Sequence, residues 1–232
     1  IKAVPAVLPL GRENSLKGIV DLLKQKAVFE GDGKTRESDI PKEIAEEAQK
    51  ALKALIEAIA ETDDALLEKY LEGATLSPEE TLSALRKAVL QGKLFPAYCG
   101  SSLKKIGLNP LLDAMTALLP TPEESGMVKG KDPKKQETIE RKPSPQDPLS
   151  AWVFKTFVDP FAGKINLLRV YSGTLNSDST VYNSTKGVSE RIGQIYQIIG
   201  KKQEVKGFAQ AGDIVSVMKL KDTVSGDTLC TD

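Results

Sequence analysis

Apolar residues between positions 41 and 60 recur at the spacing of an α-helix. They lie three or four residues apart and so share one helix face, at Ile44, Ala48, Leu52, Leu55, Ile56 and Ile59. Pro41 suits the first turn, because a proline there loses no hydrogen bond. A second helix is expected to follow, with Thr62 as its N-cap and Gly73 just after its end. The pattern predicts two consecutive helices over residues 41–73.

The clearest local signal in the chain is a helix start at residues 77–80, Ser-Pro-Glu-Glu. Ser77 is predicted to be the N-cap and Pro78 the first helical residue. Glu80 completes a capping box three residues after Ser77. This third helix should stop near Gly92, because glycine is favoured just after a helix end.

A strand, a polar loop and a helix are predicted between residues 94 and 119. The apolar run Leu94–Cys99 is followed by the loop residues 100–103. Asn109 is then expected to cap a helix that ends before Pro120. In an α/β layer, this order delivers backbone N–H groups to the carboxyl edge of the sheet.

The first forty residues are less regular. Residues 3–10 and 27–29 read as strands, and residues 30–34 form a polar turn with two glycines. Residues 16–28 are apolar enough for a buried strand or a short helix, and the pattern leaves that choice open.

From Leu149 onward the apolar pattern alternates as in β-strands. The predicted strands cover residues 151–158, 164–171, 180–182, 191–199, 213–220 and 227–230. Glycines separate these strands, as in small β-barrels. Trp152 and Phe154 are expected on opposite faces of the first strand, one less buried than the other. The pattern predicts an all-β domain over residues 149–232.

Between the two halves lies a segment rich in proline and charge, residues 123–148. It contains almost nothing to bury and reads as a linker. The predicted organisation is therefore residues 1–122, a linker at 123–148, and a β-barrel at 149–232.

Composition favours a globular protein, since 40% of the 232 residues are hydrophobic and 28% are charged. Basic and acidic residues are equal at 32 each, so the chain as a whole has no charge imbalance typical of nucleic-acid binding. No apolar segment is long enough for a membrane helix, and no targeting leader is visible. The chain is expected to be cytoplasmic and monomeric, and its start at Ile1 suggests a piece of a longer protein.

The sequence excludes several kinds of catalytic site. Cys99 and Cys230 lie far apart without metal-ligand spacing, so no metal site is expected. Histidine is absent, which rules out a Ser-His-Asp or Cys-His arrangement within these residues.

Two stretches carry a family resemblance. Residues 159–183 read DPFAGKINLLRVYSGTLNSDSTVYN, and residues 211–229 read AGDIVSVMKLKDTVSGDTL. Both closely resemble the second domain of elongation factor G, the GTP-dependent factor of ribosomal translocation. The resemblance implies an α+β front part, made of a helical insert and the remnant of an α/β GTPase domain. A translation-factor-type all-β barrel follows.

The resemblance also implies sites. Ser101, Ser102 and Leu103 fall in the fifth GTPase motif, whose loop meets the edge of the guanine base; Ser102 stands where alanine is usual. The helical insert would contact the ribosomal stalk protein through acidic residues, namely Glu43, Glu46, Glu47 and Glu57. The barrel would contact small-subunit ribosomal RNA through Lys164, Arg169, Lys186, Arg191, Lys201 and Lys202.

The parts of a GTPase that hold phosphate and Mg²⁺ are missing from the sequence. Residues 31–35 contain Gly-Lys-Thr but lack the first glycine at the required spacing, and they read as a hairpin turn. GTP or GDP with Mg²⁺ would belong to the whole protein, a GTPase. This chain alone is expected to bind no nucleotide tightly and to be inactive.

Two other interpretations stay open. One is a related translational GTPase, such as release factor three or a ribosome-protection protein, although the long helical insert favours elongation factor G. The other is a stand-alone ribosome-binding module. The strand that ends at Cys99 argues against that module, because its apolar edges would lack sheet neighbours.

Overall fold

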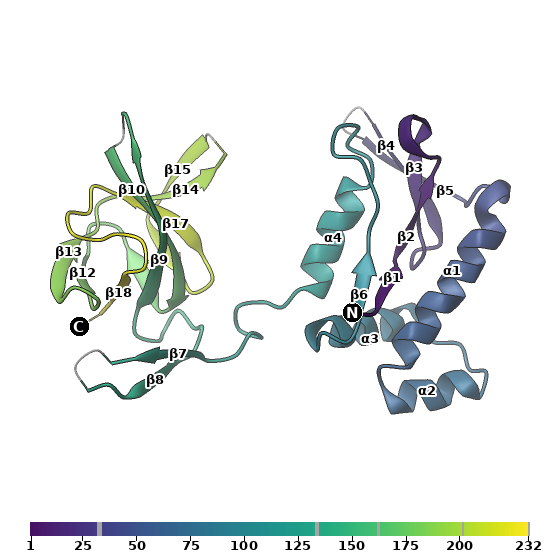
Figure 1. The fold of residues 1–232 in the computed structure, drawn as a ribbon, viewed down its shortest axis with the longest axis horizontal. Helices are drawn as coiled ribbons and strands as arrows, with labels where there is room; N and C mark the ends of the chain where they lie inside the picture. The colour runs from purple at the N-terminus through teal and green to yellow at the C-terminus, as the bar shows by residue number, and fades with distance from the viewer. Residues whose placement is uncertain (32–33, 133–134, 162, 201, 232) are drawn as a thin grey trace. The chain divides into compact units, whose positions relative to one another are not determined.

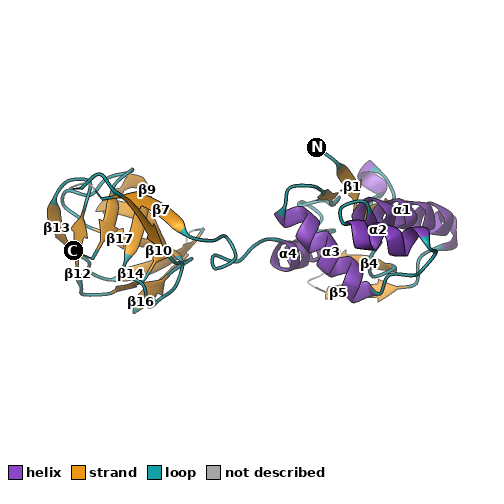
Figure 2. Ribbon diagram, turned by 90° about the horizontal axis from the view of Figure 1, so that it is seen from below, coloured by secondary structure: helices purple, strands orange, loops and turns teal. Residues whose placement is uncertain are grey.

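The computed structural model describes residues 1–31, 34–132, 135–161, 163–200 and 202–231. The chain divides into two compact units, Ile1–Leu119 and Pro120–Asp232. The front unit mixes helices and strands, whereas the second is built from strands (Figures 1 and 2). This confirms the predicted fold class. Among the described residues, none of the helices is long and apolar enough to cross a membrane.

Two small sheets form the strand part of the front unit. β1 (Ala3–Pro5) pairs in parallel with β6 (Phe95–Ala97), at opposite ends of the unit's sequence. The second sheet is antiparallel, in the order β2 (Val7–Leu10), β3 (Gly18–Asp21), β4 (Lys26–Gly31) and β5 (Lys34–Ser38). Residues 16–28, which the pattern left open, therefore contain the whole of β3 and the start of β4 rather than a helix. A short 3₁₀ turn at Glu13–Ser15 precedes β3.

Four helices complete the described part of the front unit: α1 (Lys42–Ala60), α2 (Asp64–Leu71), α3 (Pro78–Leu90) and α4 (Leu108–Leu118). Leu55 and Ile59 of α1 are fully buried, as the helical spacing predicts. They share one core with Leu85 of α3, Leu118 of α4 and Val20 of β3. The helices thus pack on the strands through a single apolar cluster.

Of the three predicted N-caps, one is correct and two are wrong. The capping box is confirmed: Ser77 Oγ accepts from the Glu80 N–H at 3.2 Å, and the Ser77 N–H donates to Glu80 Oε2 at 2.8 Å. The N-cap of α2 is Asp63 rather than Thr62, whose hydroxyl instead donates to the Ile59 carbonyl at 2.7 Å. The N-cap of α4 is Gly107 rather than Asn109.

The second unit is a β-barrel built around an eight-stranded antiparallel sheet. Its order is β13 (Val188–Arg191), β12 (Thr180–Asn183), β18 (Thr228–Cys230), β9 (Ser150–Asp159), β10 (Gly163–Ser172), β17 (Ile214–Met218), β14 (Ile195–Ile199) and β15 (Lys202–Lys206). A separate pair joins β11 (Thr174–Asn176) to β16 (Phe208–Gln210). The interior is apolar, with Val153, Leu168, Ile192, Val217 and Leu229 buried in one cluster.

Two predictions about the barrel strands are wrong. Residues 191–199 are not one strand: β13 ends at Arg191 and β14 begins at Ile195, with Gly193 between them. Trp152 and Phe154 do not face opposite sides of β9, because residues two apart in a strand share a face. They are 43% and 37% exposed, and their ring centroids lie 6.4 Å apart.

The segment predicted as a linker, residues 123–148, contains a β-hairpin of its own. β7 (Val128–Lys131) pairs antiparallel with β8 (Thr138–Arg141), and Val128 lies opposite Arg141. The compact unit that contains the barrel includes this hairpin. Residues 144–149 then meet the barrel at Gly173, whose N–H donates to the Ser144 carbonyl at 2.9 Å. Gly173 has φ +71°, and a Cβ there would lie 2.5 Å from the Asp147 carbonyl oxygen.

Candidate functional sites

The loop predicted to meet a guanine base connects β6 to α4. Ser101 and Ile106 close it by exchanging two backbone hydrogen bonds, of 2.8 and 3.0 Å. Ser101 Oγ also accepts from the Lys104 N–H at 3.2 Å. Ser102 and Leu103 lie exposed at the tip, and Leu103 is 92% exposed. The loop is thus a tight turn whose tip, at Ser102 and Leu103, is presented to solvent.

The backbone donors of this loop are not equivalent. The Ser101 N–H is used by the Ile106 carbonyl. Within the described part of the chain, the N–H groups of Ser102 and Leu103 have no protein acceptor. Of the three predicted residues, these two therefore have N–H groups available to a ligand.

Long-range contacts hold the loop and the start of α4. The Glu30 carboxylate accepts the N–H groups of Leu108 and Asn109, each at 3.0 Å, and so caps α4 from strand β4. The Asn109 side chain donates to Thr35 Oγ1 at 2.9 Å. Lys104 Nζ donates to the Asn14 carbonyl at 2.6 Å. The loop and the start of α4 are therefore anchored to strands β4 and β5 and to the 3₁₀ turn at Glu13–Ser15, which lies between β2 and β3.

Burial changes the titration of two side chains that precede the loop. Burial, with a smaller contribution from Asp21, raises the pKa of Tyr98 to about 12. Burial also raises the pKa of the Cys99 thiol. Tyr98 and Cys99 pack against Val7, Ile19 and Ile106. Both side chains are therefore uncharged at neutral pH, which fits a structural role.

The four glutamates predicted to meet the stalk protein, Glu43, Glu46, Glu47 and Glu57, all lie on α1 and are all exposed. The opposite side of α1 carries the buried residues Ala48, Leu55 and Ile59. Among the residues that the structure describes, none of the four glutamates makes an ion pair. Their charges are available to a partner.

The cations predicted to contact RNA differ in availability. Lys164 Nζ donates to the Lys221 carbonyl at 2.7 Å. Lys186 Nζ donates to the Asp222 carbonyl and lies 3.5 Å from Asp227 Oδ2. Lys202 pairs with Glu204 at 2.6 Å, and Lys201 lies outside the described residues.

Arg169 and Arg191 complete the predicted set. Arg191 is exposed and, within the described ranges, makes no ion pair. The Arg169 guanidinium carbon lies 5.2 Å from the centroid of the Tyr171 ring, while its Nε is buried without a hydrogen-bond partner. Among the described cations of this set, Arg191 is therefore the most available to a partner.

Lys34 and Thr35 of the Gly-Lys-Thr run begin the second strand of a hairpin, as expected. β4 and β5 pair with Gly31 opposite Lys34, and residues 32 and 33 lie outside the described residues. Thr35 belongs to β5 and is exposed. Antiparallel strands on both sides distinguish this turn from a phosphate-binding loop, which joins a strand to a helix.

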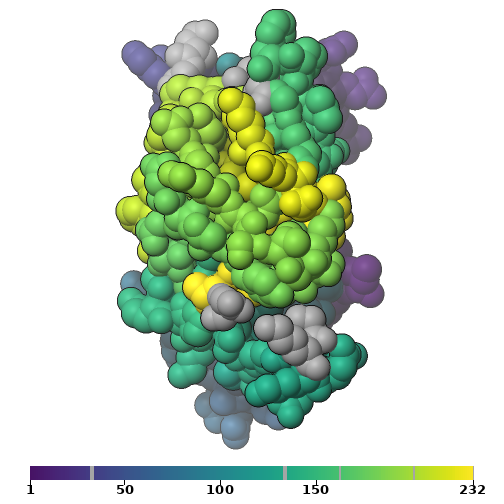
Figure 3. Space-filling view, turned by 90° about the vertical axis from the view of Figure 1, so that its left-hand side faces the viewer, coloured from purple at the N-terminus to yellow at the C-terminus, as the bar shows by residue number. Residues whose placement is uncertain are grey.

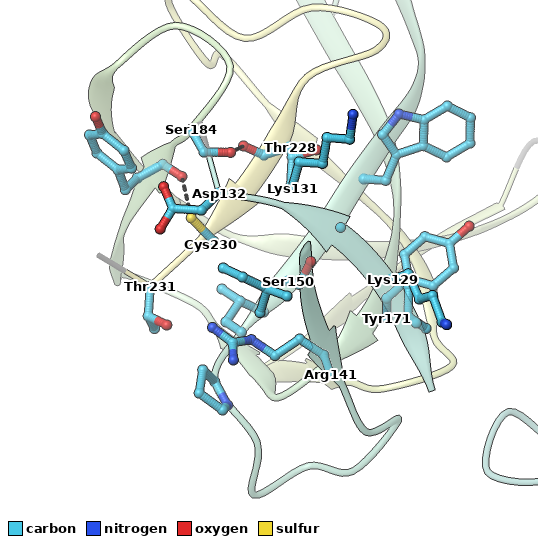
Figure 4. Close-up of a pocket in the computed structure, with 17 residues that line it drawn as sticks. Lys129, Lys131, Asp132, Arg141, Ser150, Tyr171, Ser184, Thr228, Cys230 and Thr231 are labelled. Atoms are coloured by element: carbon cyan, nitrogen blue, oxygen red, sulfur yellow. Dashed lines mark hydrogen bonds between the residues drawn. The ribbon is translucent and has the colours of Figure 1, made fainter. Parts of the chain in front are cut away.

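A groove of about 840 Å³ lies between the β7–β8 hairpin and the barrel (Figure 4). The sequence did not predict it. Its lining includes the aromatic residues Trp152, Tyr171 and Tyr182 and the cations Lys129, Lys131 and Arg141. In the space-filling view of Figure 3, residues of the hairpin segment lie in teal below the yellow and green residues of the barrel. Residues far apart in the sequence build the groove, and no motif could have revealed it.

Comparison with known proteins identifies the barrel. Residues 148–232 match the family described as elongation factor G domain 2. These residues belong to that family. The resemblance to elongation factor G seen in the sequence is thus confirmed for the β-barrel at residues 148–232.

A solved structure extends the comparison to the front unit. A protein of Thermus thermophilus, known from its crystal structure, matches with a TM-score of 0.79 and 32% sequence identity. The match covers 99% of this chain and 32% of that chain. The chain therefore spans about a third of the length of the protein it matches, and the elongation factor G domain 2 is one part of the shared structure.

Proposed function

We propose that this chain is the middle section of elongation factor G and serves to dock a GTP-driven translocation factor on the ribosome. The observation that carries the proposal is the elongation factor G domain 2 at residues 148–232, preceded by a helical unit that matches the same Thermus protein. In the whole protein, GTP hydrolysis would supply the energy. The chain itself would contribute contacts and mechanical coupling.

An exposed apolar stripe on α4 supports a larger GTPase domain. Its members lie at helical spacing and are each at least 40% exposed: Leu108, Leu111, Leu112, Met115 and Leu119. β6 beside it pairs with β1 alone among the described strands. A contiguous apolar stripe of this kind normally meets another surface. We infer that further GTPase-domain structure covers it, which disfavours a stand-alone module.

The loop and the acidic helix face would divide the contacts between nucleotide and ribosome. The exposed N–H groups of Ser102 and Leu103 would meet the guanine edge when the rest of the nucleotide site is present. The glutamates of α1 would meet basic residues of the stalk protein, where complementary charge chiefly raises the association rate. Arg191 and neighbouring cations of the barrel would neutralise RNA phosphates.

The test is binding of the full 232-residue chain to isolated ribosomes, measured by co-sedimentation with and without the stalk protein. We expect weaker binding to ribosomes that lack the stalk protein. The triple variant Glu43→Lys, Glu46→Lys and Glu47→Lys should weaken binding to complete ribosomes and leave binding to stalk-depleted ribosomes unchanged.

A matched control carries the same charge change elsewhere in the front unit, at the exposed residues Glu68, Glu72 and Glu79. This control should bind like the unaltered chain. Equal loss in both triple variants would show that net charge alone is responsible and would contradict the stalk-protein contact. Absence of any ribosome binding by the unaltered chain would contradict the docking proposal.

A further inference from the structure

We propose that the groove between the β7–β8 hairpin and the barrel binds an extended acidic segment of a partner protein as an added β-strand. The proposal does not rest on the proposed function, because it uses none of the residues assigned to nucleotide, stalk protein or RNA. Its basis is the geometry and the charge of the groove walls.

The hairpin faces the groove with one edge of β7. Four consecutive residues of β7 do so, 128–131, whereas β8 contributes the alternate residues Ile139 and Arg141. Side chains of a strand alternate between two faces, so alternate residues mark a face and consecutive residues mark an edge. Among the described strands, β7 pairs with β8 alone. Its other edge therefore offers backbone donors and acceptors toward the groove.

The outer face of the barrel forms the floor of the groove. Residues of three barrel strands line this floor: Ser150 and Trp152 from β9, Tyr182 from β12 with Ser184 just after it, and Thr228 and Cys230 from β18. The floor is thus the outer face of adjacent strands in the order β12-β18-β9. An extended peptide along β7 would direct every second side chain onto this face.

The described residues of the groove walls carry more positive than negative charge. Lys129 pairs with Glu140 at 3.2 Å, but within the described residues Lys131 and Arg141 make no ion pair. Arg141 is half-buried, and among the described residues that line the groove Asp132 is the single one with a carboxylate side chain. Figure 4 shows Arg141 beside the groove and Asp132 toward the Cys230 end. A guanidinium in such a wall is suited to a carboxylate of the bound segment.

These observations favour a peptide over RNA. Trp152 and Tyr171 could stack against bases. The free edge of β7, however, alternates N–H donors with carbonyl acceptors. The RNA backbone has a 2′-OH donor but does not repeat donor and acceptor in the register of a β-strand. A polypeptide strand satisfies both. The apolar part of the floor then receives apolar side chains, and the two cations receive carboxylates.

Trp152 makes the proposal directly measurable, because it is the one tryptophan of the chain and lies in the groove. The probe is an eight-residue peptide that alternates valine and glutamate, titrated into the full chain. We expect a saturable change in tryptophan fluorescence. The same peptide with lysine in place of glutamate should bind at least tenfold more weakly. A peptide N-methylated at alternate residues should lose binding, because it cannot donate to the edge of β7.

Variants then test the cation. Arg141→Gln should weaken binding of the valine–glutamate peptide about tenfold, the range expected for one charge-assisted contact. Lys142→Gln is the matched control, since Lys142 is the adjacent exposed cation outside the groove, and it should change affinity less than twofold. Thermal unfolding of both variants should match the unaltered chain, so a lost interaction is distinguished from a lost fold.

Several results would overturn the proposal. Equal binding of the N-methylated peptide would exclude strand addition. Tighter binding of a single-stranded oligouridylate than of the acidic peptide would assign the groove to RNA. Dimers of the chain in light scattering that the peptide dissociates would assign it to a second copy. A lack of fluorescence change at millimolar peptide would exclude the groove as a peptide site.

Discussion

Glu190 shows how one buried carboxylate can fix an irregular loop. It is 4% exposed and lies on β13. Its two oxygens accept the N–H groups of Lys221, Asp222 and Thr223 at 3.1, 2.8 and 2.8 Å, and the Thr223 hydroxyl at 2.9 Å. Burial alone would raise its pKa, but these four hydrogen bonds outweigh burial and hold the pKa below its ordinary value.

A second carboxylate continues the same network. Asp227 Oδ2 accepts from Asn183 Nδ2 at 3.0 Å and from the Val224 N–H at 2.9 Å. Lys186 lies 3.5 Å from it. Burial opposes the charge of Asp227 as well, and these partners nevertheless lower its pKa. Residues 219–227 join β17 to β18. Hydrogen bonds to Asn183 of β12 and Glu190 of β13 therefore hold this segment in place.

Replacing Glu190 by glutamine should cost about 2 kcal/mol at pH 7, since a buried charged acceptor is lost. Because the folded pKa of Glu190 is depressed, its stabilisation is complete above the ordinary value of 4.5 and is lost as pH falls through the folded pKa. The difference between the two proteins should therefore shrink below pH 4.5. Urea unfolding at several pH values measures it.

The control for this prediction is Glu123→Gln, at an exposed position of the second unit. It should change the free energy of unfolding by less than about 0.5 kcal/mol at every pH. A Glu190→Gln difference that stays constant from pH 7 to pH 3 would show that the carboxylate charge does not stabilise the loop.

At the scale of elements, the starts of helices α3 and α4 are stabilised in two different ways. The capping box of α3 is local, and Ser77→Ala should cost about 1 kcal/mol because the Glu80 N–H loses its acceptor. Ser83→Ala is the matched control, since Ser83 lies exposed within α3, where alanine is the better helix former. Chemical unfolding followed by helical circular dichroism compares the two. Equal stability of both variants would contradict a stabilising role of the cap.

The start of α4 depends on backbone conformation instead. Gly107 has φ +75°, and a Cβ there would lie 2.5 Å from the Cys99 carbonyl oxygen. Gly107→Ala should therefore destabilise the loop by about 2 kcal/mol or more, from left-handed strain plus the clash. Gly126→Ala separates the two causes, because Gly126 has φ +81° but open space around it.

The measurement for Gly107→Ala is hydrogen exchange of residues 98–108 together with the unfolding free energy. We expect faster exchange there than in the unaltered chain, and a smaller cost, about 1 kcal/mol, for Gly126→Ala. Similar costs at both glycines would mean that the approach of Gly107 to Cys99 is unimportant.

The elements also show what a sequence can predict. The capping box at Ser77 is confirmed because all its partners lie within three residues. The cap of α4 escaped prediction because its acceptor, Glu30, is 78 residues away from Leu108. Strands of three residues such as β11 and β16 were missed as well, since so short a segment has no measurable periodicity.

At the scale of the whole molecule, the two units have separate apolar cores. The barrel core is drawn from residues 149–229, and the largest core of the front unit from residues 4–118. Leu168 and Leu55 are fully buried in these two clusters. Replacing either by alanine should cost about 3 kcal/mol in its own unit. The two units should therefore unfold in separate transitions.

Two signals distinguish these transitions. Trp152 lies in the barrel unit, whereas all described helices lie in the front unit. Leu55→Ala should lower the midpoint seen by helical circular dichroism and leave the tryptophan midpoint unchanged, and Leu168→Ala should do the reverse. If Leu55→Ala moved both midpoints equally, the units would unfold as one.

The candidate sites were predictable to different degrees. The exposed glutamates of α1 followed from helical spacing, because the apolar face fixed where the other face must point. The groove beside Arg141 did not, since the described residues of its walls are 128–132, 139, 141, 148–150, 152, 171, 182, 184, 228, 230 and 231. Tertiary packing alone brings such segments together, and nothing in their local sequence records it.

The proposed division of parts between this chain and a longer GTP-driven factor leads to a prediction about nucleotide. Most of the affinity of a GTPase for GTP comes from a loop that surrounds the phosphates and from Mg²⁺. The sequence has no such loop, and the tip at Ser102 and Leu103 offers two backbone N–H groups. Two such contacts, worth about 1 kcal/mol each, are too few to hold a nucleotide.

Titration calorimetry of the full chain with GTP and GDP in the presence of Mg²⁺ should therefore give no saturable heat at micromolar nucleotide, and phosphate release should match that of buffer. The elongation factor G domain 2 should remain folded in the same samples, as reported by Trp152 fluorescence. Saturable micromolar binding that disappears in a variant with proline at Leu103 would place a complete guanine site in this chain, contrary to the division proposed here. The expected absence of binding would agree with the proposal that phosphate chemistry belongs to parts of a longer GTP-driven factor.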